Sequence, residues 1–251
     1  MRRWAGMVQY PWVWCAVWCV FALSFPTCVD ASTDSEIQPV VDWLLENPER
    51  LEFIPFADVV EATAGKRVLP LDKDDFTDAF VLNVLSSVLN DCLEQLNTAE
   101  HLIHEIGRIN EVSRPIEDFL MQALDAVDGL SCSVPLNAVG EVQRSGYPDL
   151  RLEHELSGRV FYIDPKIYRK GSERSGFRTF YFEPKLETNK ILDDASHLIV
   201  GIAHSGRNDG KWYFDSWQIV DLAGFQVRLK AEFQASNKDL YKESAVLLSS
   251  E

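Results

Sequence analysis

Two acidic residues and one lysine near the middle of the chain could together support the hydrolysis of a phosphodiester. Asp149 follows a proline, and Asp164 lies fifteen residues later and begins the triplet Asp164-Pro165-Lys166. Two carboxylates and an amine on adjacent strands can hold a divalent cation beside a positioned water. Magnesium prefers oxygen ligands and usually takes one or two protein carboxylates with water and substrate phosphate, so Mg²⁺ (or Mn²⁺) is the expected cofactor.

The residues around this triad predict two strands that position it. Residues 150–156 alternate apolar and charged side chains, as a half-buried strand does, and residues 160–168 form an aromatic and β-branched run. Side chains on a strand repeat their direction every two residues, so Asp164 and Lys166 should project from one face. If the two strands form an antiparallel hairpin, Asp149 and Asp164 converge at one end of it. Lys166 could then orient or deprotonate the attacking water, or neutralise charge on the phosphate.

The helical half of the chain comes first. Apolar side chains recur at steps of three and four before residue 130, which predicts helices that pack on a core. Asp72 or Asp74 is the expected N-cap of the longest one. The helices are expected at residues 36–47, at residues 75–96, after a Thr98 cap, and from Pro115 to near Gly129.

The second half predicts a mixed β-sheet, so the fold class is α+β. Beyond the two strands above, strands are expected at residues 178–186, 197–204, 212–220 and 225–229, and a closing helix at residues 231–244. The predicted domain organisation is a signal peptide at residues 1–31, a helical region packed on the core at residues 32–130, and a sheet core with the C-terminal helix at residues 131–251.

The acid and lysine arrangement resembles the PD-(D/E)xK nuclease superfamily, which contains many restriction endonucleases. The matching residues are Pro148-Asp149 and Asp164-Pro165-Lys166. The resemblance implies a restriction endonuclease-like mixed sheet with this motif on a central hairpin. It also implies that Asp149 and Asp164 bind the metal, that Lys166 serves the water, and that the substrate is DNA.

Members of this superfamily often add an acidic residue from the helix before the first strand. Glu105, Glu111 and Glu117 lie on or beside predicted helices, and the sequence does not choose among them.

A second registration of the motif stays open. Glu183 and Lys185 repeat the triplet pattern one predicted strand later, and Asp164 would then take the role of the first aspartate. The first registration is preferred because only Asp149 lies in a Pro-Asp turn. A further alternative is that these acids and lysines simply face water on two amphipathic strands.

A basic segment after the triplet indicates a phosphate partner. The net charge of the chain is −15, so the surface as a whole should not attract nucleic acid, and any contact with DNA needs a local basic strip. Such a strip would contact phosphates without reading bases. Alternatively, its side chains pair with the acidic body. The residues expected to bind the DNA backbone are Arg169, Lys170, Arg174 and Arg178.

Residues 1–31 have the pattern of a signal peptide. Two arginines precede an uncharged apolar run, and small residues follow at Val29-Asp30-Ala31. We therefore expect an exported protein (periplasmic or secreted) with no stable membrane insertion after cleavage. If the segment is not part of the true product, the protein is cytoplasmic. Cys92 and Cys132 remain in the mature chain, either paired or as buried free thiols.

The sequence therefore predicts a magnesium-dependent endonuclease that hydrolyses phosphodiester bonds in DNA. The alternative is an exported, non-catalytic binding protein on the same fold. A thiol-dependent hydrolase would have to use Cys92 or Cys132, and neither has a motif around it. The oligomeric state is open, a homodimer included.

Overall fold

The computed structural model describes residues 36–176 and 179–250, so the predicted signal peptide at residues 1–31 lies outside the described residues. The chain forms two compact units, residues 1–46 and residues 47–251. In the first unit the described residues contain α1 (Gln38–Glu46), which confirms the predicted helix that ends before Pro48. No helix within the described ranges has the length and apolar character needed to cross a bilayer.

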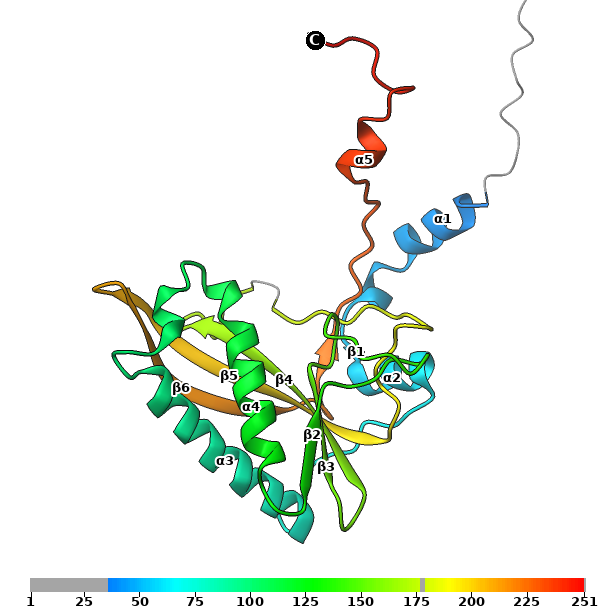
Figure 1. Cartoon of the computed structure of the whole chain (residues 1–251). Helices are drawn as coiled ribbons and strands as arrows, with labels where there is room; N and C mark the ends of the chain where they lie inside the picture. The colour runs from blue at the N-terminus through cyan, green and yellow to red at the C-terminus, as the bar shows by residue number, and fades with distance from the viewer. Residues whose placement is uncertain (1–35, 177–178, 251) are drawn as a thin grey trace, which may run out of the picture. The chain divides into compact units, whose positions relative to one another are not determined.

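A five-stranded mixed sheet dominates the second unit (Figure 1). The strand order is β2-β3-β4-β5-β6, and only the β4–β5 pair is parallel. β3 and β4 form an antiparallel hairpin, as predicted. The α+β class is therefore confirmed. The strands are β2 (Leu130–Ser133), β3 (Leu150–His154), β4 (Arg159–Arg169), β5 (Ala195–Asn208) and β6 (Lys211–Asp221).

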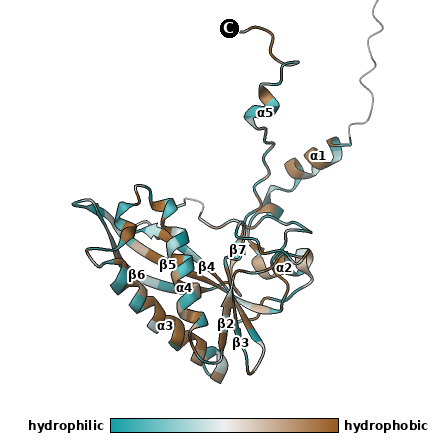
Figure 2. Ribbon diagram, in the orientation of Figure 1, coloured by the Kyte–Doolittle hydropathy of each residue, from teal (hydrophilic) through white to brown (hydrophobic). Residues whose placement is uncertain are grey.

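One face of the sheet is covered by two helices, α3 (Phe76–Leu96) and α4 (Ser113–Asp125) (Figure 1). Both were predicted, and Figure 2 shows β5 as mainly hydrophobic and α3 as mixed, which fits a helix with one face on a core. Asp75, rather than Asp72 or Asp74, caps α3 and accepts hydrogen bonds from the backbone amides of Thr77 and Asp78. The buried side chains of this first core include Leu85, Leu89, Ile116, Leu120, Leu152, Phe161, Ile163 and Leu198.

The other face carries a second, smaller core. It is built around Phe56, the fully buried first residue of α2 (Phe56–Ala64), an element that the sequence did not reveal. Phe56 makes edge-to-face contacts with the rings of Tyr147, Phe180 and Phe182. Tyr162 of β4 is also buried in this core. Aromatic packing therefore closes the face that carries the even-numbered side chains of β4.

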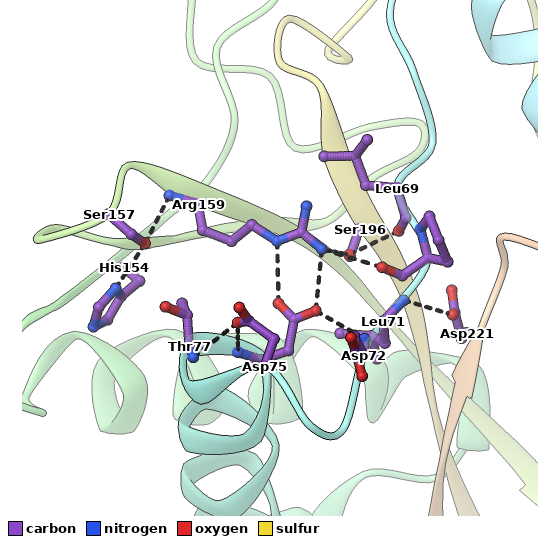
Figure 3. Close-up of polar contacts among 12 residues, drawn as sticks. Leu69, Leu71, Asp72, Asp75, Thr77, His154, Ser157, Arg159, Ser196 and Asp221 are labelled. Atoms are coloured by element: carbon purple, nitrogen blue, oxygen red, sulfur yellow. Dashed lines mark hydrogen bonds and ion pairs between the residues drawn. The ribbon is translucent and has the colours of Figure 1, made fainter.

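A partly buried ion pair connects α3 to the beginning of β4 (Figure 3). The guanidinium of Arg159 donates to both carboxylate oxygens of Asp78, at 3.1 and 3.2 Å, and to the hydroxyl of Ser196 on β5, at 2.8 Å. The Ser196 hydroxyl in turn donates to the carbonyl of Leu69. This network joins three elements that are far apart in the sequence.

The predicted helix after Thr98 is wrong, because the segment forms two short 3₁₀ turns, η2 (Leu102–Glu105) and η3 (Ile109–Glu111). Side chains from the far end of the sheet take the backbone acceptors that a helix would use. The guanidinium of Arg207 donates to the carbonyl of His104, and the indole of Trp212 donates to the carbonyl of Ile106.

Three predictions in the last third of the chain also need correction. Residues 179–186 form no strand, because Phe180 and Phe182 pack into the second core instead of pairing in a sheet. The strand at residues 225–229 shortens to β7 (Gln226–Val227), which pairs with β1 (Ile54–Pro55) outside the main sheet. The closing helix shortens to α5 (Asn237–Leu240). The short 3₁₀ helix η1 (Pro48–Leu51) completes the described elements.

Removing the acid of the partly buried ion pair should destabilise the protein. Asp78 is 2% exposed, so Asp78→Ala leaves the Arg159 guanidinium without its counter-charge at the junction of α3 and β4. We expect a loss of about 3 kcal/mol in the free energy of unfolding, measured by urea denaturation followed by circular dichroism. The matched control is Asp74→Ala, an exposed acid of the same segment, which should change it by less than about 0.5 kcal/mol. Equal effects of the two variants would contradict the anchoring role.

Candidate active site

The register of the β3–β4 hairpin places Asp149 opposite Asp164. Leu150 pairs with Ile163 at the last position of the ladder, so Asp149 and Asp164 are the next residues on each side. Both lie on the face of the second core, because Leu150 and Ile163 belong to the first core and side chains alternate along a strand. The local pattern of alternation therefore brings together two acids that are fifteen residues apart.

Lys166 completes the cluster from the same face of β4. Its Nζ lies 3.8 Å from Oδ2 of Asp149 and forms a shorter ion pair with Oδ2 of Asp164. The Asp164 side chain is 2% exposed, the Asp149 side chain 15% and the Lys166 side chain 31%. The structure thus unites all three residues of the preferred registration, with the lysine on the more open side.

The environment favours the neutral form of Asp149. Burial and then the negative charge of Asp164 raise the pKa of Asp149 from 3.8 to about 8, and the positive charge of Lys166 opposes the rise. One ammonium therefore does not compensate two adjacent carboxylates in a partly buried site. A divalent cation between them would favour the ionised form of both.

Of the three helix acids considered above, only Glu117 lies near the cluster. Glu105 and Glu111 are exposed on the 3₁₀ turns, whereas Glu117 is half-buried on α4. Burial raises the pKa of Glu117, and the charges of Lys166 and Asp164 also act on it. The structure therefore selects, among these acids, the one on the helix that precedes β2.

The Asp149 and Asp164 carboxylates are oxygen ligands of the kind that Mg²⁺ and Mn²⁺ prefer. The described residues contain no group of three or more histidine, cysteine, aspartate or glutamate side chains arranged around one ion. The protein would therefore supply the two carboxylates of Asp149 and Asp164, and water and phosphate the remaining oxygens, as is common for Mg²⁺. Oδ2 of Asp164 is buried and accepts no hydrogen bond, although Lys166 lies beside it, so this oxygen can serve a cation.

A buried tyrosine and histidine support the turn that carries Asp149. Tyr147 precedes Pro148 through a cis peptide bond, and its hydroxyl is hydrogen-bonded at 2.8 Å to Nδ1 of His197 on β5. Burial lowers the pKa of His197 to about 3, so the ring is neutral. No pattern in the sequence predicts this pair, because a tyrosine and a histidine fifty residues apart form no motif.

The residues of the second registration do not join the cluster. Glu183 and Lys185 form an ion pair with each other at 3.0 Å, and their side chains are 76% and 51% exposed. They lie in a segment without helix or strand, so no third strand carries the triplet to Asp164.

The basic segment begins beside the cluster. Lys166 and Arg169 line a cavity of about 820 Å³ on this face of the sheet, together with Ser172 and Thr179 of the following crossover. Lys170 is partly exposed and forms an ion pair with Asp215 of β6 at 2.9 Å. Arg174 is exposed. Arg178 lies outside the described residues.

Neither cysteine is suited to nucleophilic catalysis. Cys92 and Cys132 are both free and buried, not paired. Burial raises the pKa of each thiol to about 12, so the reactive thiolate is scarce at neutral pH.

Comparison with known proteins finds one family and one curated relative. Residues 50–244 match the family described as the type II restriction enzyme MjaV family. The chain is 30% identical over 230 residues to the type II restriction enzyme MjaV of Methanocaldococcus jannaschii, and the alignment covers 87% of this chain and 96% of that protein. The family match includes Asp149, Asp164 and Lys166 and begins after the predicted signal peptide.

The raised pKa of Asp149 predicts how the stability of the metal-free protein depends on pH. The unfolded aspartate ionises near pH 3.8 and the folded one near pH 8, so the folded state holds an extra proton between these values. The contribution of Asp149 to stability therefore falls as the pH rises through this window and is level above it. In Asp149→Asn this part of the decline should disappear. Urea denaturation with a chelator, from about pH 5 to pH 9, measures the difference between the two pH profiles. Parallel profiles would contradict the shift.

Proposed function

Because the chain belongs to the type II restriction enzyme MjaV family, we propose that it is an endonuclease that hydrolyses phosphodiester bonds in DNA with a divalent cation, Mg²⁺ or Mn²⁺. The observation that carries this proposal is the meeting of the Asp149 and Asp164 carboxylates at the ammonium of Lys166. The non-catalytic binding protein is not favoured, because both the family and the curated relative are restriction enzymes.

Asp149 and Asp164 would hold the metal ion, and each has a distinct structural role. Asp164 lies within β4 and is almost completely buried, so the strand fixes its position. Asp149 lies just before β3, where Tyr147 and His197 support the turn. When bound there, a divalent cation polarises the phosphate and makes a water more acidic.

Lys166 would serve the attacking water and the phosphate. Its side chain is the most exposed of the three, and its ammonium already lies near both carboxylates. From this place it can donate a hydrogen bond to a water beside the acids and hold it in position. The same charge can stabilise the negative charge that develops on the phosphate during attack.

Contacts with the DNA backbone would come from the basic segment after β4. Arg169 lines the cavity beside Lys166, and Lys170 and Arg174 follow it on the crossover. Because the chain has a net charge of −15, a local source of positive charge is needed beside the acids. Export and a homodimer stay predictions.

The lysine assignment is tested by cleavage of long DNA of mixed sequence in Mg²⁺. We expect Lys166→Ala to lose on the order of 10²-fold or more in rate, because it removes a positioned donor from the reacting group. Asp164→Asn should be at least as slow. Lys185→Ala, the lysine of the second registration, is the matched control and should cleave like the unaltered protein. Slow cleavage by Lys185→Ala with normal cleavage by Lys166→Ala would favour the second registration. Normal cleavage by all three variants would refute both.

The basic segment is tested by the salt dependence of DNA binding. In the Asp164→Asn background, in which we expect no cleavage, Arg169→Ala and Arg174→Ala should each reduce the slope of log affinity against log salt by about 0.9. Lys170→Ala should have a smaller effect, because Asp215 already pairs with this lysine. Fluorescence anisotropy measures the slopes, and Lys242→Ala, a partly exposed lysine near the C-terminus, is the control. Unchanged slopes in both arginine variants would exclude this segment as the phosphate contact.

A further inference from the structure

A second lysine, Lys190, is buried close to the two acids. Its side chain is 1% exposed, and its Nζ has no hydrogen-bond partner. No ion pair joins it to a carboxylate within the described ranges. An ammonium has three donors and is costly to remove from water, so such a group normally has acceptors or compensating charge nearby.

The packing around Lys190 ties it to both strands that carry the acids. The next residue, Ile191, is buried in the second core with Tyr147 and Tyr162. The hydroxyl of Tyr162 accepts hydrogen bonds from the backbone amides of Leu192 and Asp193, at 2.9 and 3.2 Å. Tyr147 lies two residues before Asp149, and Tyr162 two residues before Asp164. The segment of Lys190 is therefore held against the same side of the hairpin as the acids.

The acids of the site act electrostatically on Lys190. Burial lowers its pKa, and the negative charges of Asp149, Asp164 and Glu117 oppose this effect, in that order. Lys166 contributes a smaller effect of the opposite sign. The burial of Lys190 and the packing of Ile191 in the second core place Lys190 on the closed side of the site, whereas the Lys166 side chain is 31% exposed and lies on the open side.

We propose that Lys190 is a fixed cation on the buried side of the Asp149–Asp164 pair, where it does the electrostatic work of a second metal ion, so that the centre binds one divalent cation per chain. The proposal rests on the metal-assisted hydrolysis proposed above. Lys190 is a positioning residue, because it acts through the two carboxylates and contacts no substrate. Lys190, Lys166 and one divalent ion together carry four positive charges, and Asp149, Asp164 and Glu117 carry three negative charges. The remaining positive charge can neutralise one phosphodiester.

The experiment is a Mn²⁺ titration of the full chain without DNA at about pH 8.5, above the raised pKa of Asp149. Free Mn²⁺ is followed by electron paramagnetic resonance and heat by calorimetry. The unaltered protein should bind one Mn²⁺ per chain. Lys190→Met keeps the length of the side chain and removes its charge, so it should bind the ion about tenfold more tightly, because a repelling cation is gone. Lys242→Met, which makes the same change far along the chain, should bind like the unaltered protein.

Each outcome separates this inference from the proposed function. If the unaltered protein binds two ions, or if folded Lys190→Met binds Mn²⁺ equally or more weakly, the role of Lys190 is refuted and the metal site stands. If the unaltered protein binds no Mn²⁺, the proposed metal-dependent function is refuted, and the inference about Lys190 is refuted with it. Circular dichroism checks the fold of Lys190→Met. Should that variant unfold, Lys190→Gln replaces it, and the number of ions bound by the unaltered protein still decides.

Discussion

The burial of β4 on both faces is the constraint on which the site depends. Odd-numbered side chains such as Phe161 and Ile163 enter the core beneath α3 and α4. The even-numbered side chains lie on the opposite face. Val160 and Tyr162 enter the second core, and the next two, Asp164 and Lys166, are charged. A slip of one residue would exchange the two sets and bury both charges under the helices. The hydrophobic pattern of β4 therefore determines the face of the sheet from which Asp164 and Lys166 project.

The site lies where the pairing of β4 changes. On one side β3 pairs only as far as Ile163, whereas on the other side β5 pairs in parallel as far as Arg169. From Asp164 onward β4 is therefore free of β3, which is where Pro165, with no amide hydrogen to donate, is tolerated. The acids consequently lie at an edge that is open on one side and packed on the other. Lys166 and Lys190 occupy these two sides.

The arrangement of acids that the proposed chemistry needs at this edge lowers the stability of the folded protein. Burial and then the negative charge of Asp164 raise the pKa of Asp149, so holding both acids in their charged form at this place costs stability. The surrounding structure holds them together through rigid contacts, namely the Tyr147–His197 hydrogen bond and the aromatic packing around Phe56. Arg159, at the other end of β4, anchors the strand to α3 through Asp78. The strand is thus fixed at one end by the Arg159–Asp78 ion pair, and at its other end two acids share the single ammonium of Lys166.

Local sequence determined the elements with a strong period and the triad within them. The three-to-four spacing of α3 and α4, the alternation of β3 and the aromatic and β-branched run of β4 are properties of neighbouring residues, so the strands that carry Asp149, Asp164 and Lys166 could be predicted from them. Only the tertiary structure decided the segments whose partners are remote. Phe180 and Phe182 pack on Phe56 instead of forming a strand, and Arg207 and Trp212 take the carbonyls of an expected helix. Glu117 and Lys190 lie near the acids for the same reason. The packing of α4 and of the segment before β5 against the sheet brings them there, and no spacing along the chain encodes it.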